Sequence, residues 1–356
     1  MHVIISGYFG FDNEGDEAIL QSIIDELRLI DPAIKLTVLS HNPDQTKEKY
    51  GVDAVNRWKI QHVIKVLKKS NGLISGGGSL LQDKTGMKSI PYYTGIIHLA
   101  KLFNKPVFVY AQGMGPINHT FSQALTRLAL NRQLKLTVRD EGSKQLLEQI
   151  GVTSPITEVP DAVFGLKQAL EPSAWLDELQ LQQFIAVSVR AWPNTNAFFD
   201  QLSSVLDHLY QAGYAIVFIP MHGVKDEDQA KALAKTMTAP VCHVPTHTSL
   251  NEKLAILSKA DVLLGMRLHA LIFSSIVDTP FGAFSYDPKI DALAKKIKQP
   301  ILTSVEDHNQ QDLLSKTLHF IERKDHYKSL LSTEVKQLKQ AADDTASQAI
   351  SYFKNN

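Results

Sequence analysis

The strongest constraint on the fold is an alternation of short apolar runs with amphipathic stretches, which continues along almost the whole chain. This alternation predicts an α/β protein with parallel sheets whose strands are connected by helices. In the first half, the expected strands cover residues 2–6, 35–39, 72–75, 106–110 and 134–138. The helix expected after the first strand has one apolar face and places Asp25, Glu26 and Arg28 on its outward face.

The alternation stops over residues 166–183, where a polar stretch without a strand predicts a connection between two domains. It restarts with the runs FIAVSVR, YAIVFIP, PVCHV, DVLLG and PFGAFSY. We therefore expect two Rossmann-like domains in series, over residues 1–165 and 184–309, with a cleft between them as in the B-type glycosyltransferases. The pattern of residues 310–356 predicts a helical tail, which we expect to pack back onto the first domain. A chain of 356 residues is long enough for two cores.

Composition excludes several classes of protein. The 37 basic and 37 acidic residues balance, so no global field favours nucleic acid. The single cysteine excludes an intramolecular disulfide and fits a reducing compartment. The first residues lead directly into the first expected strand, so we expect no signal peptide. The most apolar long window, residues 261–277, is interrupted by Arg267 and His269, so we expect no membrane span there. We expect a cytoplasmic protein. The sequence lacks HExxH, so we expect no metal. It also lacks GxSxG, GxGxxG and a phosphate loop with lysine, which weakens an esterase, a dehydrogenase and a P-loop kinase, and we expect no bound cofactor.

The segment GYFGFDNEGDEAIL, residues 7–20, follows the first expected strand. Gly10 and Gly15 have the GxxxxG spacing of a nucleotide-binding loop. Asp16 and Glu17, however, occupy the positions at which such a loop carries lysine and a hydroxyl residue. The loop is therefore acidic where a phosphate site would be basic.

Other unusual segments also follow expected strands, and ligands in open parallel sheets bind beyond the carboxyl ends of the strands. Three consecutive glycines, Gly76, Gly77 and Gly78, permit close approach of a ligand, although a tight turn explains them equally well. AQGMGP and TVRD follow the next two strands, and Arg139 in TVRD has Asp140 or Glu141 as possible ion-pair partners. In the second half the corresponding segments are SVRAW, GMRLHALIFS and FSYDPKI.

These second-half segments bring cations to the strand ends. Arg267 and His269 fall in the first turn of an expected helix, where a cation is unfavourable unless something negative binds beside it. A histidine satisfied within the helix packing is the alternative for His269, and a solvated surface charge is the alternative for Lys289. Together with Arg139 and Arg190, these residues predict a cationic cleft in a chain of zero net charge.

In this order, the segments resemble those of the polysaccharide pyruvyl transferases, particularly the CsaB type, over nearly the whole chain. The resemblance implies a fold like that of the B-type glycosyltransferases. It also implies transfer of a pyruvyl group from phosphoenolpyruvate to a saccharide, which forms a cyclic pyruvate ketal and releases phosphate. By position, the family's functional arginine, histidine and lysine fall on Arg139, His269 and Lys289. DAVF, residues 161–164, departs from the family's DPxF-like sequence.

The implied reaction gives the cationic and the acidic residues different roles. Phosphoenolpyruvate carries two acidic groups, which arginines bind well, so we expect the donor mainly on the second domain, with Arg139 reaching in from the first. Carboxylates and amides orient hydroxyl groups, so the acidic loop suits a saccharide, although acids in a first helical turn also stabilise the helix by about 0.3–1 kcal/mol each. The expected donor-binding residues are Arg190, Arg267, Gly265 and Tyr286, and the expected acceptor-binding residues are Asn13, Asp16, Glu17, Gly76, Gly77, Gly78 and Gln112.

The family's acceptors are cell-wall or exported polysaccharides, often as lipid-linked precursors, which implies at most peripheral contact with the inner membrane surface. Two other functions remain open from the sequence. One is a glycosyltransferase of the same fold that uses a nucleotide-sugar donor, and the other is a non-catalytic protein that binds anions or glycans. The released product separates them, because the first releases a nucleotide and the second releases nothing.

Overall fold

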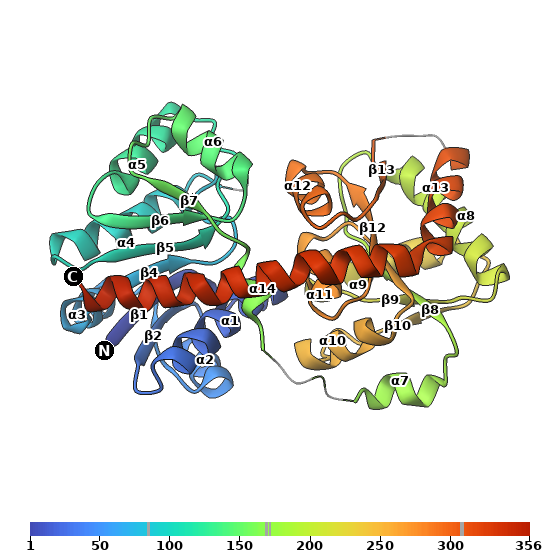
Figure 1. Ribbon diagram of the computed structural model, residues 1–356, viewed down its shortest axis with the longest axis horizontal. Helices are drawn as coiled ribbons and strands as arrows, with labels where there is room; N and C mark the ends of the chain where they lie inside the picture. The colour runs from blue at the N-terminus through green and yellow to red at the C-terminus, as the bar shows by residue number, and fades with distance from the viewer. Residues whose placement is uncertain (84–85, 168–169, 171, 307–309) are drawn as a thin grey trace. The chain divides into compact units, whose positions relative to one another are not determined.

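The computed structural model describes residues 1–83, 86–167, 170, 172–306 and 310–356. The chain forms two compact units, of which unit 1 comprises Met1–Lys167 with Leu338–Asn356 and unit 2 comprises Gln168–Gln337. Residues 168, 169 and 171 of the expected connection lie outside the described residues, as do residues 307–309 at the end of the second expected domain. Each unit contains one parallel sheet with helices on both faces (Figure 1).

Unit 1 is built on a seven-stranded sheet with the order β3-β2-β1-β4-β5-β6-β7. Its strands are β1 (His2–Phe9), β2 (Lys35–Ser40), β3 (Asp53–Asn56), β4 (Gly72–Gly76), β5 (Val107–Gln112), β6 (Leu134–Val138) and β7 (Ile156–Glu158). The helices are α1 (Glu14–Ile30), α2 (Pro43–Tyr50), α3 (Ile60–Lys69), α4 (Ser89–Leu102), α5 (Thr120–Leu130) and α6 (Glu141–Gln149), followed by the 3-10 turn η1 (Ala162–Gly165).

Unit 2 repeats this topology in a six-stranded sheet with the order β10-β9-β8-β11-β12-β13. Its strands are β8 (Phe184–Ser188), β9 (Ala215–Phe218), β10 (Val241–His243), β11 (Val262–Gly265), β12 (Phe281–Ser285) and β13 (Ile301–Ser304). The helices are α7 (Ala174–Leu179), α8 (Asn196–Gln211), α9 (Gly223–Ala234), α10 (Leu250–Lys259), α11 (Leu268–Ile276), α12 (Pro288–Lys296) and α13 (Gln310–Glu322). The expected architecture of two Rossmann-like sheets is therefore confirmed.

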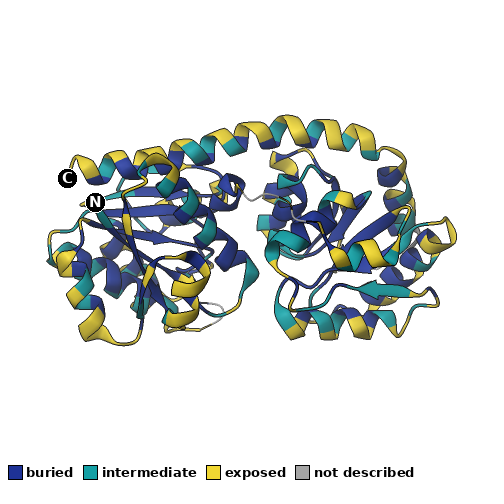
Figure 2. Cartoon of the chain, turned by 90° about the horizontal axis from the view of Figure 1, so that it is seen from below, coloured by how far each residue is buried: buried dark blue, intermediate teal, exposed yellow. Residues whose placement is uncertain are grey.

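The strands that the sequence did not predict are β3, β7 and β13, and each lies at the edge of its sheet. They are three or four residues long and partly exposed, in contrast to central strands such as β4 and β8, whose residues are all buried (Figure 2). A strand buried on both faces gives a continuous apolar run, whereas a short, half-exposed edge strand leaves little apolar signal.

The C-terminal helix α14 (Lys324–Lys354) is shared by the two units, with its residues up to Gln337 in unit 2 and those from Leu338 in unit 1. In unit 2, Lys298 forms an ion pair with Glu334 of this helix at 2.7 Å. In unit 1, the ring of Phe353 lies against Gly72 so closely that a Cβ at that position would collide with it. The expected tail of residues 310–356 is thus divided, since α13 and the first part of α14 belong to unit 2.

The packing of α14 also corrects the expected orientation of Glu26. Instead of facing outward, Glu26 is buried, and its Oε2 accepts a hydrogen bond from the Tyr110 hydroxyl at 3.2 Å. Burial, together with Asp343 of α14, raises the pKa of Glu26 to about 8. The sequence around α1 gave no sign of this, because Tyr110, Gly165 and Asp343, which lie against Glu26, are all distant from it in sequence.

We predict that Phe353→Ala lowers the free energy of unfolding by about 3–5 kcal/mol, because it leaves a cavity against β4 and β5. Phe353 is 5% exposed and its ring lies 6.5 Å from that of Phe108. Urea denaturation measures the change. The matched control is Phe121→Ala, since Phe121 is 64% exposed and its loss should cost under about 0.5 kcal/mol. Equal effects of the two substitutions would contradict the docking of α14 described here.

Candidate functional site

In unit 1, the predicted site residues gather where β1, β4, β5 and β6 end. The loops after these strands contact one another, since the N–H of Gly113 after β5 donates to the carbonyl of Gly78 after β4 at 3.0 Å. Arg139 follows β6, and α1 begins directly after the acidic loop that follows β1. The fold therefore brings the glycines, the acids and the arginine of the first unit to one edge of the sheet, as expected for parallel strands.

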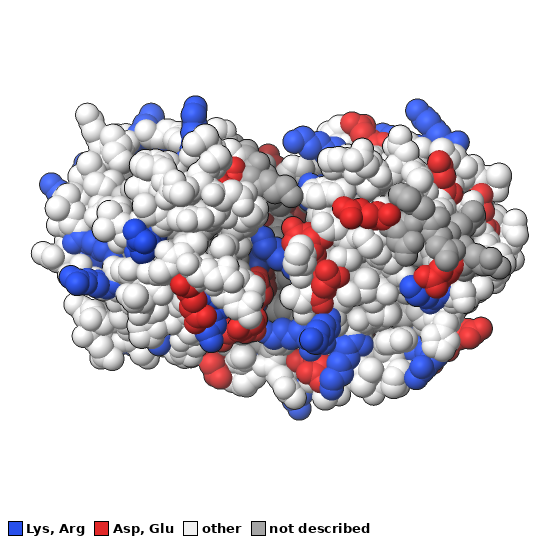
Figure 3. Space-filling model, turned by 90° about the horizontal axis from the view of Figure 1, so that it is seen from above, with Lys and Arg blue, Asp and Glu red and all other residues white. Residues whose placement is uncertain are grey.

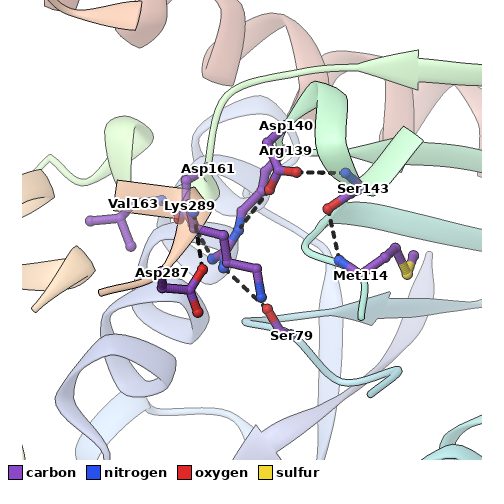
Figure 4. Close-up of polar contacts among 9 residues, drawn as sticks. All are labelled: Ser79, Met114, Arg139, Asp140, Ser143, Asp161, Val163, Asp287 and Lys289. Atoms are coloured by element: carbon purple, nitrogen blue, oxygen red, sulfur yellow. Dashed lines mark hydrogen bonds and ion pairs between the residues drawn. The ribbon is translucent and has the colours of Figure 1, made fainter. Parts of the chain in front are cut away.

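Arg139 is held by several partners within unit 1. Its guanidinium donates to Asp161 Oδ2 and to Ser79 Oγ, at 2.7 Å and 3.2 Å, and Asp140 Oδ2 lies 3.7 Å from its Nε (Figure 4). Burial disfavours the charged guanidinium, but Asp161 and Asp140 outweigh this effect and raise the pKa of Arg139. Arg139 is thus an ion-paired residue in a fixed orientation rather than a mobile surface cation.

Asp16 lies in the field of this arginine, against the glycine turn. Gly78 has a φ of +51°, and a Cβ at this position would collide with Asp16 Oδ1. Asp16 is 7% exposed, and within the described part of the chain no hydrogen bond or ion pair reaches its carboxylate. Burial raises the pKa of Asp16 to about 7, although Arg139 opposes the shift. A carboxyl group with this pKa can accept or release a proton near neutral pH.

The neighbours of Asp16 in the acidic loop have structural partners. Glu17 accepts hydrogen bonds from the N–H of Gly10, at 2.8 Å, and from the Tyr50 hydroxyl. Asn13 caps α1 by accepting a hydrogen bond from the N–H of Gly15 at 3.2 Å, and Asp12 accepts one from Gln45 at 3.0 Å. These contacts shape the loop. In contrast, no hydrogen bond of the described structure reaches the carboxylate of Asp16.

Gln112 ends β5 and is fully buried, and neither atom of its amide has a hydrogen-bond partner among the described residues. Buried side-chain amides without partners are rare in folded proteins. The preceding residue, Ala111, has a φ of +46°, and the pairing of β5 with β6 shifts register between Val109 and Gln112. This irregularity places an amide able to donate and accept at the sheet edge that carries the candidate site.

In unit 2, Arg190 follows β8 and is held by aromatic rings. Its guanidinium lies 5.2 Å from the ring centroids of both Trp192 and Tyr286, and it donates to the Tyr286 hydroxyl at 3.0 Å. No carboxylate of the described residues lies within ion-pair distance of it. The cation–π contacts and the hydrogen bond hold the guanidinium, while no carboxylate of the described residues compensates its charge, which suits an anionic ligand.

Arg267 has a different environment, because it forms an ion pair with Asp226 of α9. Asp226 is 1% exposed and also accepts a hydrogen bond from the N–H of Met221 at 3.2 Å. The negative partner that a cation at this helix start requires is therefore supplied by the protein itself. His222 lies nearby, and burial and the charges of Arg267, Lys225 and Arg190 lower its pKa, although Asp226 opposes the shift.

The other predicted residues of unit 2 occupy helix starts. His269 is the second residue of α11, for which Arg267 is the N-cap, and Lys289 is the second residue of α12. Asp287 caps α12 by accepting a hydrogen bond from the N–H of Lys289 at 3.0 Å (Figure 4). A Cβ on Gly265 would lie 2.8 Å from Leu271 Cδ2, so this glycine permits close packing of α11 on β11.

Sequence reasoning missed several residues that position the candidate site. They are Ser79, Asp161, Trp192, His222 and Asp226. Asp161 was visible only as the first residue of DAVF, and a charged residue within an apolar stretch was the available signal for it. The partners of Arg139 and Arg267 lie 22 and 41 residues away in sequence, so spacing gave no indication of either pair.

Three further features concern the surface, metal binding and membrane spans. Acidic and basic side chains are interspersed on the face drawn in Figure 3. Over the described ranges, no three His, Cys, Asp or Glu side chains are placed to hold a metal ion. None of the helices in the described structure has the length and apolar character needed to span a membrane.

Comparison with known proteins identifies the family. The family model described as polysaccharide pyruvyl transferase matches residues 13–288, which is most of the chain. The chain belongs to the polysaccharide pyruvyl transferase family. It is also similar to the amylovoran biosynthesis protein AmsJ of Erwinia amylovora, with 21% identity over 85% of this chain and 88% of that protein. The expected family is thereby confirmed.

Solved structures of two other proteins share the fold of this pyruvyl transferase family member. Anabaena HepE in complex with UDP and glucose superposes with a TM-score of 0.67 and 10% identity, over 100% of both chains. UDP-GlcNAc 2-epimerase from Neisseria meningitidis, bound to UDP-GlcNAc, gives a TM-score of 0.65 and 12% identity, also over 100% of both chains. At these identities the likeness shows the fold, which is the expected two-domain α/β fold of the B-type glycosyltransferase kind.

We predict that Asp16→Asn stabilises this pyruvyl transferase more at pH 8 than at pH 5. The folded-state pKa of Asp16, about 7, lies above the ordinary value of 3.8, so folding favours the protonated form. The resulting stability is present at low pH and is lost as the pH rises through about 7, whereas asparagine has no such dependence. Urea denaturation of both proteins at each pH measures the difference in their free energies of unfolding. Because Glu26 titrates in both proteins, its contribution cancels in this difference. A constant difference between pH 5 and pH 8 would show that Asp16 is not protonated in the folded state.

Proposed function

We propose that the protein transfers a pyruvyl group from phosphoenolpyruvate to a saccharide, forming a cyclic pyruvate ketal and releasing phosphate. Family membership supports transfer to a polysaccharide or its precursor. The observation that carries the specific donor is Arg190, whose guanidinium is held by two aromatic rings, has no carboxylate partner in the described structure, and acts on His222 together with Arg267 and Lys225. A ligand with two acidic groups matches this excess of positive charge.

The donor would be bound by unit 2. Arg190 is suited to a bidentate contact with the carboxylate or the phosphate, because its plane is already fixed by Trp192 and Tyr286. Arg267 contributes less net charge, since Asp226 compensates it. His269 and Lys289, at the starts of α11 and α12, complete the proposed donor site.

In the proposed chemistry, His269 gives a proton to the methylene carbon of phosphoenolpyruvate, which makes the neighbouring carbon electrophilic. A saccharide hydroxyl attacks that carbon, and its proton passes to a base. Lys289 assists the departure of phosphate. A second hydroxyl of the saccharide attacks the same carbon and closes the ketal, and its proton passes to the departing phosphate. Histidine suits the first step because its pKa lies near neutrality.

The acceptor would be bound by unit 1, with Asp16 as the base for the attacking hydroxyl. Its carboxylate is buried, has no hydrogen bond in the described structure, and has a pKa of about 7. Gln112 offers a buried amide for orienting a second hydroxyl. We further propose that the reaction occurs in the cytoplasm, that the acceptor is a precursor of an exported polysaccharide, and that no metal or cofactor takes part.

The decisive experiment incubates the protein with phosphoenolpyruvate and a panel of simple and lipid-linked saccharides, with EDTA present. We expect release of phosphate and a product whose mass spectrum shows a pyruvate ketal. Parallel reactions contain UDP-sugars in place of phosphoenolpyruvate. Release of UDP with transfer of the sugar would identify a glycosyltransferase instead, and binding without any turnover would identify a glycan-binding protein. Activity that EDTA abolishes and magnesium restores would refute the absence of a metal.

We predict that His269→Ala leaves the fold intact and lowers kcat by about 10²–10⁴-fold, the usual contribution of general acid–base catalysis. His269→Gln should be nearly as inactive but bind phosphoenolpyruvate better than the alanine variant, since it keeps hydrogen bonding without proton transfer. Lys289→Ala should weaken donor binding as well as slow turnover, because it removes a positive charge. Steady-state kinetics and calorimetric titration with phosphoenolpyruvate measure these effects. A folded His269→Ala protein with the parental rate would assign the histidine a structural role.

A further inference from the structure

A group of aromatic rings lies beside the acidic loop of unit 1 and has no part in the reaction derived above. We call it the aromatic platform, and it consists of Tyr8, Phe11, His41, Trp58 and Tyr92. Its members come from the end of β1, the acidic loop, the turns after β2 and β3, and α4. Trp58 is 60% exposed and Tyr8 is 39% exposed. A group of large apolar side chains that is exposed in this way usually marks a binding surface.

The platform is ordered without a ligand. The rings of Tyr8 and Phe11 stack at 4.1 Å, and those of Phe11 and His41 stack at 4.4 Å, each nearly parallel. Trp58 lies 5.2 Å from the ring of Tyr92, and its indole N–H donates to His41 Nδ1 at 3.4 Å. The N–H of Trp58 itself donates to Asn56 Oδ1 at 2.9 Å, which fixes the turn after β3.

Arg57 is buried against the rings of the platform. It is 4% exposed, and its guanidinium lies over the rings of Phe11, Trp58 and Tyr92 at 5.3, 5.1 and 4.3 Å. It also donates to the carbonyl of Gly7 at 2.9 Å and to the Tyr93 hydroxyl at 3.1 Å. Because its polar atoms are directed inward, Arg57 positions the rings and presents little charge to a ligand. The exposed part of the platform therefore presents aromatic rings rather than the charge of Arg57.

The acidic loop that carries Phe11 is held against the start of α1, where Asp16 lies. The N–H of Gly10 donates to Glu17 Oε1 at 2.8 Å, and the N–H of His41 donates to the carbonyl of Phe9 at 3.0 Å. Burial and the charge of Asp16 raise the pKa of Tyr8, although Arg57 opposes the shift. Phe11 is also the residue before Asp12 in the acidic loop. A molecule that lies on the platform is thus adjacent to the proposed base.

We propose that the aromatic platform binds a sugar ring of the saccharide acceptor by stacking and so brings a hydroxyl group to Asp16. This inference rests on the proposed function, which makes the acceptor a saccharide. A pyranose ring has an apolar face of C–H groups, which gains free energy when an aromatic ring removes it from water. Its hydroxyl groups point outward from the ring edge, where carboxylates and amides such as Asp12 and Asn13 can accept or orient them.

The charges around the platform favour a neutral sugar over other ligands that stack on aromatic rings. A nucleotide or an anionic lipid headgroup would bring phosphate toward Asp12 and Asp16, which would repel it. The cation on the platform, Arg57, is buried and directed toward Gly7 and Tyr93. A membrane surface is the remaining alternative for exposed aromatic side chains, and the experiment below treats it as a separate outcome.

The test measures saccharide binding without donor and the acceptor kinetics of Trp58→Ala. Binding is titrated by calorimetry with trisaccharides of glucose, galactose, mannose, N-acetylglucosamine and N-acetylmannosamine. For the saccharide that binds the parent best, we expect Trp58→Ala to weaken binding about tenfold and to raise the acceptor KM similarly. Trp58→Phe should recover most of the loss. The KM for phosphoenolpyruvate should not change, and kcat should change less than twofold.

Phe121→Ala is the matched control, since Phe121 is a similarly exposed aromatic residue of unit 1, 64% against 60% for Trp58. It should bind the same trisaccharide with parental affinity. Parental affinity and parental acceptor KM in Trp58→Ala would overturn the proposal, as would an equal loss in Phe121→Ala. Loss of binding to phosphatidylglycerol vesicles in Trp58→Ala, with saccharide binding retained, would overturn it in favour of a membrane contact.

The design separates this inference from the proposed function. If the parent binds a trisaccharide through Trp58 but forms no product from phosphoenolpyruvate, the platform stands and the proposed donor fails. If the parent forms the ketal but Trp58→Ala does so with the parental acceptor KM, the proposed function stands and the platform fails.

Discussion

Both units of this protein depend on the fact that a parallel strand covered by helices on both faces can carry polar side chains only near its ends. Central strands such as β4 and β8 consist entirely of buried residues, so their charged neighbours lie in the loops that follow them. Because all strands of a parallel sheet point the same way, these loops meet at one edge. The acidic loop, the glycine turn and Arg139 come together in unit 1 for this reason.

The strand ends of the two units differ in which charge has no ion-pair partner. In unit 1, the arginine is compensated by Asp161 and Asp140, and the acid Asp16 is left without a hydrogen bond in the described structure. In unit 2, Arg267 is compensated by Asp226, and Arg190 is held by rings rather than by acids. The net result is a proton-accepting group in unit 1 and an anion-attracting group in unit 2. A reaction between a hydroxyl-bearing acceptor and an anionic donor requires these two properties.

Much of the candidate site was predictable because its residues stand next to strands that the sequence reveals. The positions of Arg139, Arg190, His269 and Lys289 followed from the apolar runs before them, and their roles remain predictions. The compensation of each charge was not predictable in this way. Glu17 is an acid directly beside Asp16, yet hydrogen bonds from Gly10 and Tyr50 engage it in shaping the loop. Local sequence does not distinguish an acid that binds its own backbone from one that remains available.

The sequence by itself determined the two parallel sheets, the family and the segments that form the strand ends, because these depend on periodicity and motifs within a few consecutive residues. The tertiary structure alone decided which side chains face one another. Asp343 of the last helix covers Glu26 of the first, which makes an expected surface acid a buried one. The rings around Arg57 likewise come from the loop after β1, the turn after β3 and α4, and none of these segments indicates the cluster separately. Such contacts join residues far apart in sequence, so they exist only once the sheet has placed its strands side by side.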